Sequence, residues 1–383
     1  MKKLLAGLGI ALALTACSND DEYSWDDFSD KTATDTLNIF IAFSGNSAII
    51  SGDGEGYVTA TGADVTVRSN TNKFLQLWLS GNTTDGSLLV YSWKKVGVVL
   101  NGVNMTNPDG PAINNQCSKS LIVTTAEGTT NTLSDGTQYA EAPLDNQGLA
   151  IDQKATLFSE GQIYFRGNGT LIVDAHAKNG IASDDYINVE SGTIRVQVAQ
   201  TGSNGIKVND GMTITGGTLT IEVTANGARG IKNNARTTIS GGQTTINTKG
   251  NCVIDTTYTD DVMTIDTTSC AGIKGDSLFV MTGGSLTITS SGDGGKGINC
   301  SDTILVQGGT LMATTTGSNV QGKPKAVKSD KAIILNGGYF EASCAKSWAC
   351  DNGSEEEDPE KRVEVIGTPT EQYYAKKHIK VVF

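Results

Sequence analysis

The stretch Gly205–Arg229, which reads GIKVNDGMTITGGTLTIEVTANGAR, decides the fold. Apolar and polar side chains alternate in three short runs, which contain Ile206, Met212 and Ile221. Alternation with a period of two is typical of short β-strands that bury one face. Gly216–Gly217 separates the second run from the third, and no part of the stretch has helical periodicity. The stretch therefore predicts three strands joined by turns.

The same pattern recurs along the chain. Segments that begin at Gly180, Gly230, Gly272 and Gly297 align with it without a gap, and a sixth begins at Ala326. The steps from Gly180 to Gly205 to Gly230 are each 25 residues, as is the step from Gly272 to Gly297. A period of this length indicates stacked structural units. We therefore predict an all-β fold, a single-stranded parallel β-helix whose three-strand coils each advance about 4.8 Å.

Other repeat folds fit the pattern less well. A β-propeller blade needs roughly 40–45 residues and four strands, and a leucine-rich repeat needs a Leu/Asn signature that the chain lacks. An antiparallel sandwich does not account for the gapless alignment of the units. In the β-helix, Ile should stack on Ile inside, and the Thr-rich faces should point outward.

The repeat divides the chain into predicted regions. Residues 37–111 are expected to form an N-terminal β cap and the first coils, and residues 112–350 the parallel β-helix. Residues 351–383 are expected to form an acidic loop and a closing strand, so that both ends of the stack are capped. Upstream, the column of a small residue followed by Ile continues at Ala112–Ile113 and Ala150–Ile151.

The N-terminus carries a targeting signal. Lys2 and Lys3 precede an apolar run, Leu4–Leu14, that is too short to span a bilayer, and the sequence LTAC ends at Cys17. Residues 1–16 are thus predicted to be a lipoprotein signal peptide, and Cys17 to be the lipid anchor, the chain's one attachment to the membrane. Residues 17–36 form an acidic tether that resembles the surface-export signal of Gram-negative lipoproteins. We expect an outer-membrane lipoprotein exposed at the cell surface; the alternative is a plain tether facing the periplasm.

The charge balance restricts the partners. The chain has 29 Lys and Arg against 41 Asp and Glu, a formal net charge of −12. A strongly acidic chain is a poor partner for nucleic acid, so none is expected. We expect a monomer.

Six cysteines follow Cys17. Cys252 and Cys270 bracket the one long interruption of the repeat, where the step from Gly230 to Gly272 is 42 residues. Cys344 and Cys350 bracket Trp348 in a similar way. Disulfides suit an oxidising compartment, but each pair could equally be buried as small apolar residues, and both readings stay open.

Two aligned positions of the units carry oxygen ligands. The fifth position holds Asp184, Asn209, Asn234, Asp276, Ser301 and Asp330, and the sixth adds Asp185, Asp210 and Asp302. Carboxylate and amide oxygens one coil apart on a turn suit calcium, and Asp293 in a neighbouring loop is a further candidate ligand. The alternative is that Asp and Asn stand there because they favour turns.

The third position forms a row of lysines, Lys207, Lys232, Lys274 and Lys328, with Asn299 between the last two. Stacked ammonium groups repel one another unless anions lie among them. The row is a candidate binding site for an acidic polysaccharide that lies along the helix axis; the alternative is a surface ladder of Lys and Asp without a ligand. Trp78 and Trp348 are candidate sugar platforms, although Trp78 could instead pack under a cap.

Catalysis has little support in the sequence. The two histidines, His176 and His378, stand in no recognisable motif, and there is no nucleophile elbow or phosphate-binding loop. An Arg beside calcium could act as the base of a lyase, but exposed Arg on a strand is usually solvated surface. We expect no enzymatic activity.

The unit GI(K)xxD–xxI–xGGTLxI, preceded by VVLNGVNMTN and AEGTTNTLSDG, resembles a family of bacterial carbohydrate-binding domain proteins with a polysaccharide-lyase-like fold. The resemblance runs from about Phe40 to about Ser343. It implies a right-handed parallel β-helix that contains calcium and binds cellulose or acidic, pectin-like sugars without cutting them. The insertion Val253–Ser269 and the substitutions at Asn234 and Ser301 depart from the family pattern, which leaves the ligands of calcium open.

The predicted function is therefore non-catalytic binding of polysaccharide at the cell surface, either acidic and pectin-like or a β-linked glucan, with calcium at the coil turns. Two alternatives remain. One is a calcium-dependent polysaccharide lyase, and the other is a surface adhesin or scaffold without a sugar site.

Overall fold

The computed structural model describes residues 36–259 and 262–383. The predicted signal peptide, Cys17 and the tether up to residue 35 lie outside these ranges. Leu37–Phe383 form one compact unit. Its described part consists of strands and a single 3₁₀ helix, η2 (Pro359–Arg362), and none of it is a helix that could cross a membrane.

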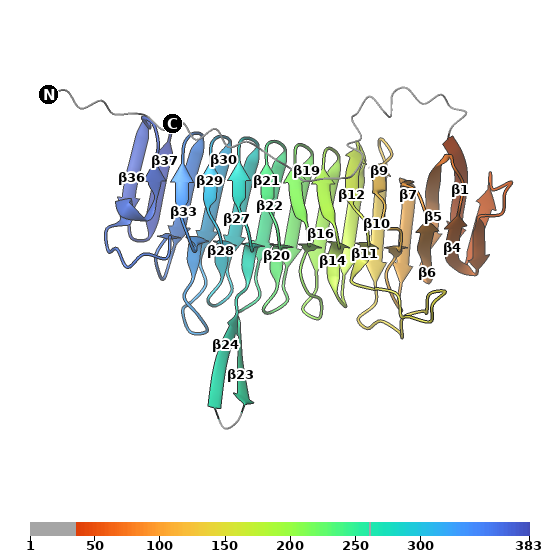
Figure 1. Cartoon of the computed structure of the whole chain (residues 1–383), viewed down its shortest axis with the longest axis horizontal. Coiled ribbons are helices and arrows are strands. Elements are labelled where there is room, and N and C mark those ends of the chain that lie inside the picture. The colour runs from red at the N-terminus through yellow and green to blue at the C-terminus, as the bar shows by residue number, and fades with distance from the viewer. Residues whose placement is uncertain (1–35, 260–261) are drawn as a thin grey trace. The chain divides into compact units, whose positions relative to one another are not determined.

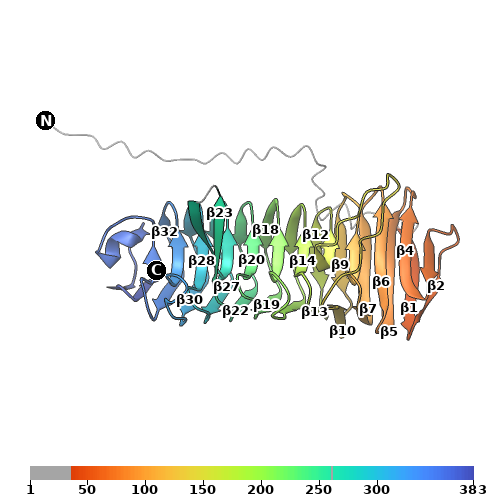
Figure 2. The ribbon, with the colours of Figure 1, turned by 90° about the horizontal axis from the view of Figure 1, so that it is seen from below.

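The strands form a parallel β-solenoid of about 11 turns, which confirms the predicted fold (Figures 1 and 2). Each regular coil contributes one strand to each of three columns. The first column is a 12-stranded sheet made of β3 (Val58–Thr61), β4 (Ala63–Ser69), β6 (Gly86–Ser92), β8 (Ile113–Asn115), β11 (Ala155–Ser159), β14 (Asn179–Ser183), β17 (Ile206–Val208), β20 (Arg229–Asn233), β25 (Ala271–Gly275), β28 (Lys296–Cys300), β31 (Lys325–Ser329) and β34 (Cys350–Asp351).

The other two columns run beside it. The second column contains β9 (Leu121–Thr125), β12 (Ile163–Gly167), β15 (Tyr186–Val189), β18 (Gly211–Ile214), β21 (Thr237–Ile239), β26 (Phe279–Met281), β29 (Ile304–Val306), β32 (Ile333–Leu335) and β35 (Glu364–Val365). The third contains β10 (Thr130–Asp135), β13 (Thr170–Ala175), β16 (Thr193–Val198), β19 (Thr218–Val223), β22 (Gln243–Thr248), β27 (Ser285–Ser290), β30 (Thr310–Thr315) and β33 (Tyr339–Cys344).

The second and third columns are continuous at one long strand. β7 (Val96–Asn107) pairs with β9 through its first half and with β10 through its second half. It also pairs with β5 (Phe74–Thr83) along most of its length. The corner that separates the two columns in later coils is reduced here to a register shift between Leu79 and Gly81, and both columns belong to one 23-stranded sheet.

The interior is built from aligned side chains. Ile206, Ile231, Ile273, Ile298 and Val327 are successive partners in the first column, and all are buried. Stacking of like residues along the axis is what the gapless repeat predicts. Burial of aliphatic side chains in every coil supplies the main stabilisation, at about 25 cal/mol per Å² of apolar surface removed from water.

The turn between the second and third columns needs glycine. The second residue of each Gly-Gly pair has a positive φ, for example 73° at Gly217 and 71° at Gly242. A Cβ atom at Gly242 would lie 2.6 Å from the carbonyl oxygen of Gly216 in the preceding coil. The Gly-Gly pairs thus allow successive turns to stack closely.

The two ends of the stack are closed by antiparallel pairs. β1 (Thr36–Ser44) pairs with β2 (Ser47–Ser51) at one end. At the other, β37 (His378–Val382) pairs antiparallel with both β33 and β36 (Glu371–Ala375). A change from parallel to antiparallel pairing ends the repeat and limits further growth of the sheet.

One predicted alignment is wrong. Leu157, rather than Ile151, occupies the position that aligns with Ile113 and Ile181. Ile151 is buried in the long segment that precedes β11. The sequence Ala150–Ile151 imitates the repeat, but the strand begins at Ala155. This shift changes which residues of the coil face the turn, as described below.

Candidate binding face and metal centre

The row of lysines is present in the structure. Lys207 on β17 aligns with Lys232 on β20, which aligns with Lys274 on β25. The row continues through Asn299 to Lys328. All of these side chains are on the outward face of the 12-stranded sheet, because the alternate residues, such as Ile206 and Ile231, point into the core.

A second row of cations lies beside the first. Arg229 aligns with Ala271, Ala271 with Lys296, and Lys296 with Lys325. We did not predict this row from the sequence, although each member stands one residue before the small residue that begins its repeat. We call Lys207, Arg229, Lys232, Lys274 and Lys296 the basic face.

Three cations of the two rows have carboxylate partners. Lys274 is 2.9 Å from Asp276, and Lys325 is 2.8 Å from Asp351. Lys328 pairs with Asp330. These pairs satisfy the lysines locally.

The other four cations of the basic face differ. Among the described residues, Lys207, Arg229, Lys232 and Lys296 have no carboxylate within ion-pair distance. Burial lowers the pKa of Lys232, and the charges of Arg229 and Lys207 lower it further. Burial likewise lowers the pKa of Arg229 and of Lys296. The cations are therefore partly desolvated and repel one another, which an anion at this face would relieve.

The side chain of Arg229 shows the same imbalance. Its Nε atom is buried and has no hydrogen-bond partner in the described part of the chain. Upstream in its row, Asn204 donates to Asn179 Oδ1 at 2.9 Å, and the backbone N–H of Arg229 donates to Asn204 Oδ1 at 3.0 Å. A ladder of neutral amides thus ends where the charged residues begin.

The predicted row of calcium ligands is largely paired with other groups. Asn209 donates to Asp184 at 3.2 Å, and Asn234 donates to Asn209 at 3.2 Å. This ladder links three coils through side-chain amides, as residues that favour turns are expected to do.

The remaining predicted ligands are dispersed. Asp276 and Asp330 pair with lysines of the row, and Asp302 is 3.0 Å from Lys331. Asp293 accepts from the backbone N–H of Ser318 at 3.2 Å. Asp185 accepts from Gln162, and Asp210 is on an exposed turn. Their side chains do not converge on one another in the described structure.

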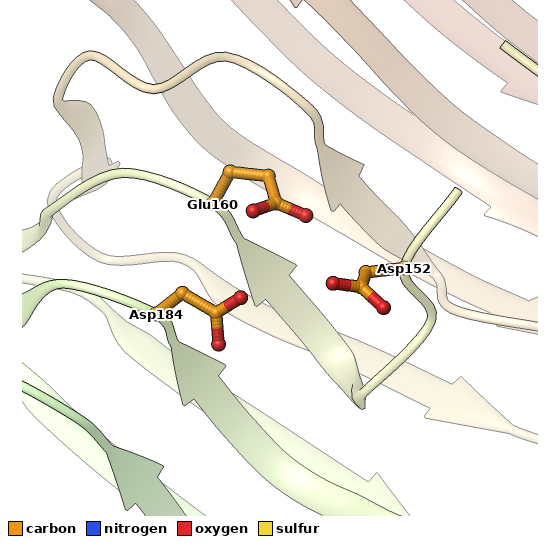
Figure 3. A group of neighbouring side chains, drawn as sticks. All are labelled: Asp152, Glu160 and Asp184. Carbon is orange, nitrogen blue, oxygen red and sulfur yellow. The ribbon is translucent and has the colours of Figure 1, made fainter. Parts of the chain in front are cut away.

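Asp184 alone of the predicted ligands meets other carboxylates. Oxygen atoms of Asp152, Glu160 and Asp184 lie within 4.8 Å of one another, and Figure 3 shows the three side chains directed toward a common space. Lys154 bridges two of them, at 2.6 Å from Asp152 and in contact with Asp184. Burial and the charges of Asp184 and Asp152 raise the pKa of Glu160 to about 7. We call Asp152, Glu160 and Asp184 the acidic cluster.

Glu160 is not among the predicted metal ligands because the sequence aligns Ile151, instead of Leu157, with the repeat. Since Leu157 aligns with Ile181, Glu160 takes the fifth position of its coil and precedes Asp184 in the same row. Asp152 comes from the irregular segment before β11, where the repeat gives no guidance. The acidic cluster fits a hard cation, because its three carboxylates and the single ammonium group of Lys154 leave a net negative charge that a divalent ion would balance.

The two tryptophans predicted as sugar platforms, Trp78 and Trp348, belong to the ends of the stack. Trp78 is on the outward face of β5, donates to Asn38 at 3.0 Å and stacks on Phe40 at 5.9 Å. The ring of Trp348 lies beneath Arg362, at 4.0 Å, and Lys376, at 4.7 Å. Trp348 thus packs against the cations of the C-terminal cap, and neither ring lies in the coils of the basic face.

Three comparisons relate this geometry to known proteins. The family model described as carbohydrate-binding domain-containing protein matches residues 61–322. A carbohydrate-binding domain-containing protein of Acetivibrio thermocellus is 33% identical over 121 residues, which is 31% of this chain and 41% of the relative. The matched part therefore spans about two fifths of that relative's length.

A solved structure has a similar fold. It is described as the polysaccharide lyase-like protein from C. thermocellum, in a gadolinium derivative. It aligns with a TM-score of 0.56 and 24% identity, over 70% of this chain and 97% of the other. At this identity the likeness concerns the fold alone.

Proposed function

The chain belongs to the family of carbohydrate-binding domain-containing proteins, and from this premise we propose that it binds an acidic polysaccharide through its basic face, without cutting it. The family supports sugar as the ligand. The observation that carries the acidic character is the group of four cations, Lys207, Arg229, Lys232 and Lys296, that lack a carboxylate partner in the described structure.

The spacing of the basic face suits a linear polyanion. The cations repeat from coil to coil, about 4.8 Å apart along the axis. Carboxylates carried at intervals along a uronic-acid chain would lie among them and relieve their mutual repulsion. A neutral β-linked glucan has no group that needs these cations.

Binding to immobilised polygalacturonate and to insoluble β-glucan tests this proposal. We expect the double variant Lys207→Gln, Lys232→Gln to lose at least tenfold in affinity for polygalacturonate. Lys249→Gln is the matched control, because Lys249 is an exposed lysine outside the basic face that pairs with Glu222 at 3.5 Å. Equal losses in both variants, or binding to the neutral glucan alone, would contradict the assignment.

The same assay separates the alternatives. A polysaccharide lyase would release unsaturated sugars that absorb in the ultraviolet, and we expect none during prolonged incubation. A surface scaffold without a sugar site would bind neither glycan.

We also propose that calcium binds at the acidic cluster. Asp152, Glu160 and Asp184 would supply the oxygens, and Lys154 would move aside as the cation takes over its electrostatic role. The cluster immediately precedes Asn209 in the row of turn residues, so calcium would fix the edge of the basic face rather than contact the sugar itself.

The proposed location is the outer face of the outer membrane, with Cys17 carrying the lipid. We expect Cys17→Ser to move the protein from the membrane fraction to the soluble fraction. Protease added to intact cells should digest the wild-type protein; survival of the protein in intact cells, with digestion only after lysis, would instead indicate the periplasmic orientation.

A further inference from the structure

The repeat is interrupted by a hairpin between β22 and β25. Its strands, β23 (Val253–Thr259) and β24 (Val262–Thr268), pair antiparallel with each other, and the hairpin projects from the stack (Figure 1). Two-stranded hairpins are marginally stable in water on their own. A stabilising contact at the base of this hairpin is therefore expected.

The base of the hairpin holds two thiols. Cys252 immediately precedes β23, and Cys270 follows β24 with one residue, Ser269, between them. Their Sγ atoms are 3.8 Å apart, and both side chains are buried. The first pair of the hairpin ladder, Val253 with Thr268, lies directly beside them.

The next coil covers the thiols. A Cβ atom at Gly294 would lie 2.8 Å from the Sγ atom of Cys252, and one at Gly295 would lie 3.4 Å from that of Cys270. The Sγ atom of Cys270 is also 3.9 Å from the backbone oxygen of Asp293. The Gly294–Gly295 pair thus closes over the two sulfur atoms without a side chain between.

The surroundings favour a thiolate at Cys252. The thiol of Cys270 hydrogen-bonds to it and, with the charges of Lys296 and Arg229, lowers its pKa against the effect of burial. The pKa of Cys270 is raised, by the same hydrogen bond and by burial. One sulfur atom is therefore prepared to attack, and its neighbour holds the proton.

We propose that Cys252 and Cys270 form a disulfide that closes the base of the hairpin. This inference concerns a covalent modification and does not depend on the sugar ligand. The oxidant is a disulfide, either a small-molecule disulfide or that of a thiol oxidoreductase. The proposed location outside the cytoplasm is where such bonds persist.

The exchange proceeds in two steps. The Cys252 thiolate attacks one sulfur of the oxidant, which forms a mixed disulfide and releases the first oxidant thiolate. Cys270 then loses its proton and attacks the Sγ atom of Cys252, which releases the second. Two electrons pass to the oxidant, whose disulfide becomes two thiols. Because Gly294–Gly295 covers the pair, the bond should resist reduction once it has formed.

Cys344 and Cys350 provide a contrast. Both are buried, but Cys344 donates to the backbone oxygen of Pro324 at 3.4 Å, and the described structure shows no sulfur–sulfur contact between them. We therefore expect this pair to remain reduced.

Alkylation of the full chain tests the proposal. The protein is exported or refolded with glutathione disulfide, denatured, and treated with N-ethylmaleimide before any reductant. Of the six cysteines from Cys117 onward, four should be labelled, and peptide mapping should recover Cys252 joined to Cys270. Labelling of all six, or a cross-link that joins another pair, would overturn the proposal.

Two variants sharpen the result. Cys252→Ser should leave Cys270 free, so that all five remaining cysteines are labelled. The matched control Cys344→Ser should leave the cross-link in place and label three. If Cys252→Ser fails to fold, the count in the denatured wild-type chain still decides the question.

Proteolysis provides an independent readout. After cleavage within residues 253–268, the two fragments of the oxidised chain should migrate together on a denaturing gel and separate when dithiothreitol is added. Fragments that separate without reductant would show that the disulfide between Cys252 and Cys270 is absent.

Discussion

Glu160 shows how one residue acquires its chemistry from its place in the coil. In a free chain it is an ordinary carboxyl group, but the stack puts it next to Asp184 and brings Asp152 to the same space. Burial and these two charges raise its pKa to about 7. The folded chain therefore holds this proton more tightly than the unfolded chain does.

This proton should make the stability of the fold depend on pH. Without metal, the free energy of unfolding should fall by about 1 kcal/mol, allowing for solvent screening at this partly exposed group, as pH rises from about 4.5 to about 7. Glu160→Gln should remove this slope and melt at a higher temperature than wild type at pH 8. Differential scanning fluorimetry in EGTA at pH 5 and pH 8 measures both effects.

Calcium should reverse the order of the melting temperatures of wild type and Glu160→Gln at pH 8. Calcium bound at the acidic cluster, as proposed, would displace the proton of Glu160 and should stabilise wild type at pH 8 by about 2.7 kcal/mol when it is 100-fold above its Kd. Glu160→Gln should gain much less, whereas the exposed control Glu141→Gln should respond like wild type. An equal response of Glu160→Gln would place calcium elsewhere or nowhere.

At the scale of the element, the coil is the unit that the sequence encodes. The alternation around Ile206 and the Gly-Gly turn predict three strands, and the 25-residue step predicts that Lys207 lies next to Lys232, as the register shows. Strands that depart from the repeat could not be predicted. The joining of two columns at β7 depends on one long strand that continues through a register shift, and Ala150–Ile151 has the local pattern of a coil without its register.

The Gly-Gly turn gives a test of how tightly coils stack. Gly242→Ala places a Cβ atom 2.6 Å from the backbone oxygen of Gly216, at a φ of 71°. We expect it to lower the free energy of unfolding by at least about 3 kcal/mol, from backbone strain and overpacking together. Urea unfolding followed by circular dichroism measures the change.

Gly45→Ala is the control for backbone strain alone. Gly45 also has a positive φ, 58°, but a Cβ atom there meets nothing within 4 Å. It should cost about 1 kcal/mol. If the two variants lose the same stability, close approach of the coils does not contribute at this turn.

At the scale of the whole molecule, charge is separated rather than balanced. The chain has a net charge of −12, yet the 12-stranded sheet gathers cations on its outward face. One row was predictable, because Lys207, Lys232 and Lys274 share a position in the repeat. The row of Arg229 and Lys296 was not, because its position also holds Asn204 and Ala271 and has no common chemistry. Whether a cation has a carboxylate partner depends on the assembled stack, and the spacing of residues in the sequence does not predict it.

The length of the face should determine how affinity depends on the length of the ligand. The basic face covers three coil steps, from the coil of Lys207 to that of Lys296, which corresponds to about 14 Å. For a series of oligogalacturonides, we expect affinity to increase with each added sugar until the chain spans this distance, and to change little beyond it. The gain should shrink at high salt, since the contacts are between charges. Isothermal titration calorimetry at two salt concentrations measures both trends, with carboxyl-reduced oligomers of equal length as the control. If affinity is already constant at the disaccharide, or if the reduced oligomers bind equally well, the cations do not act as a row.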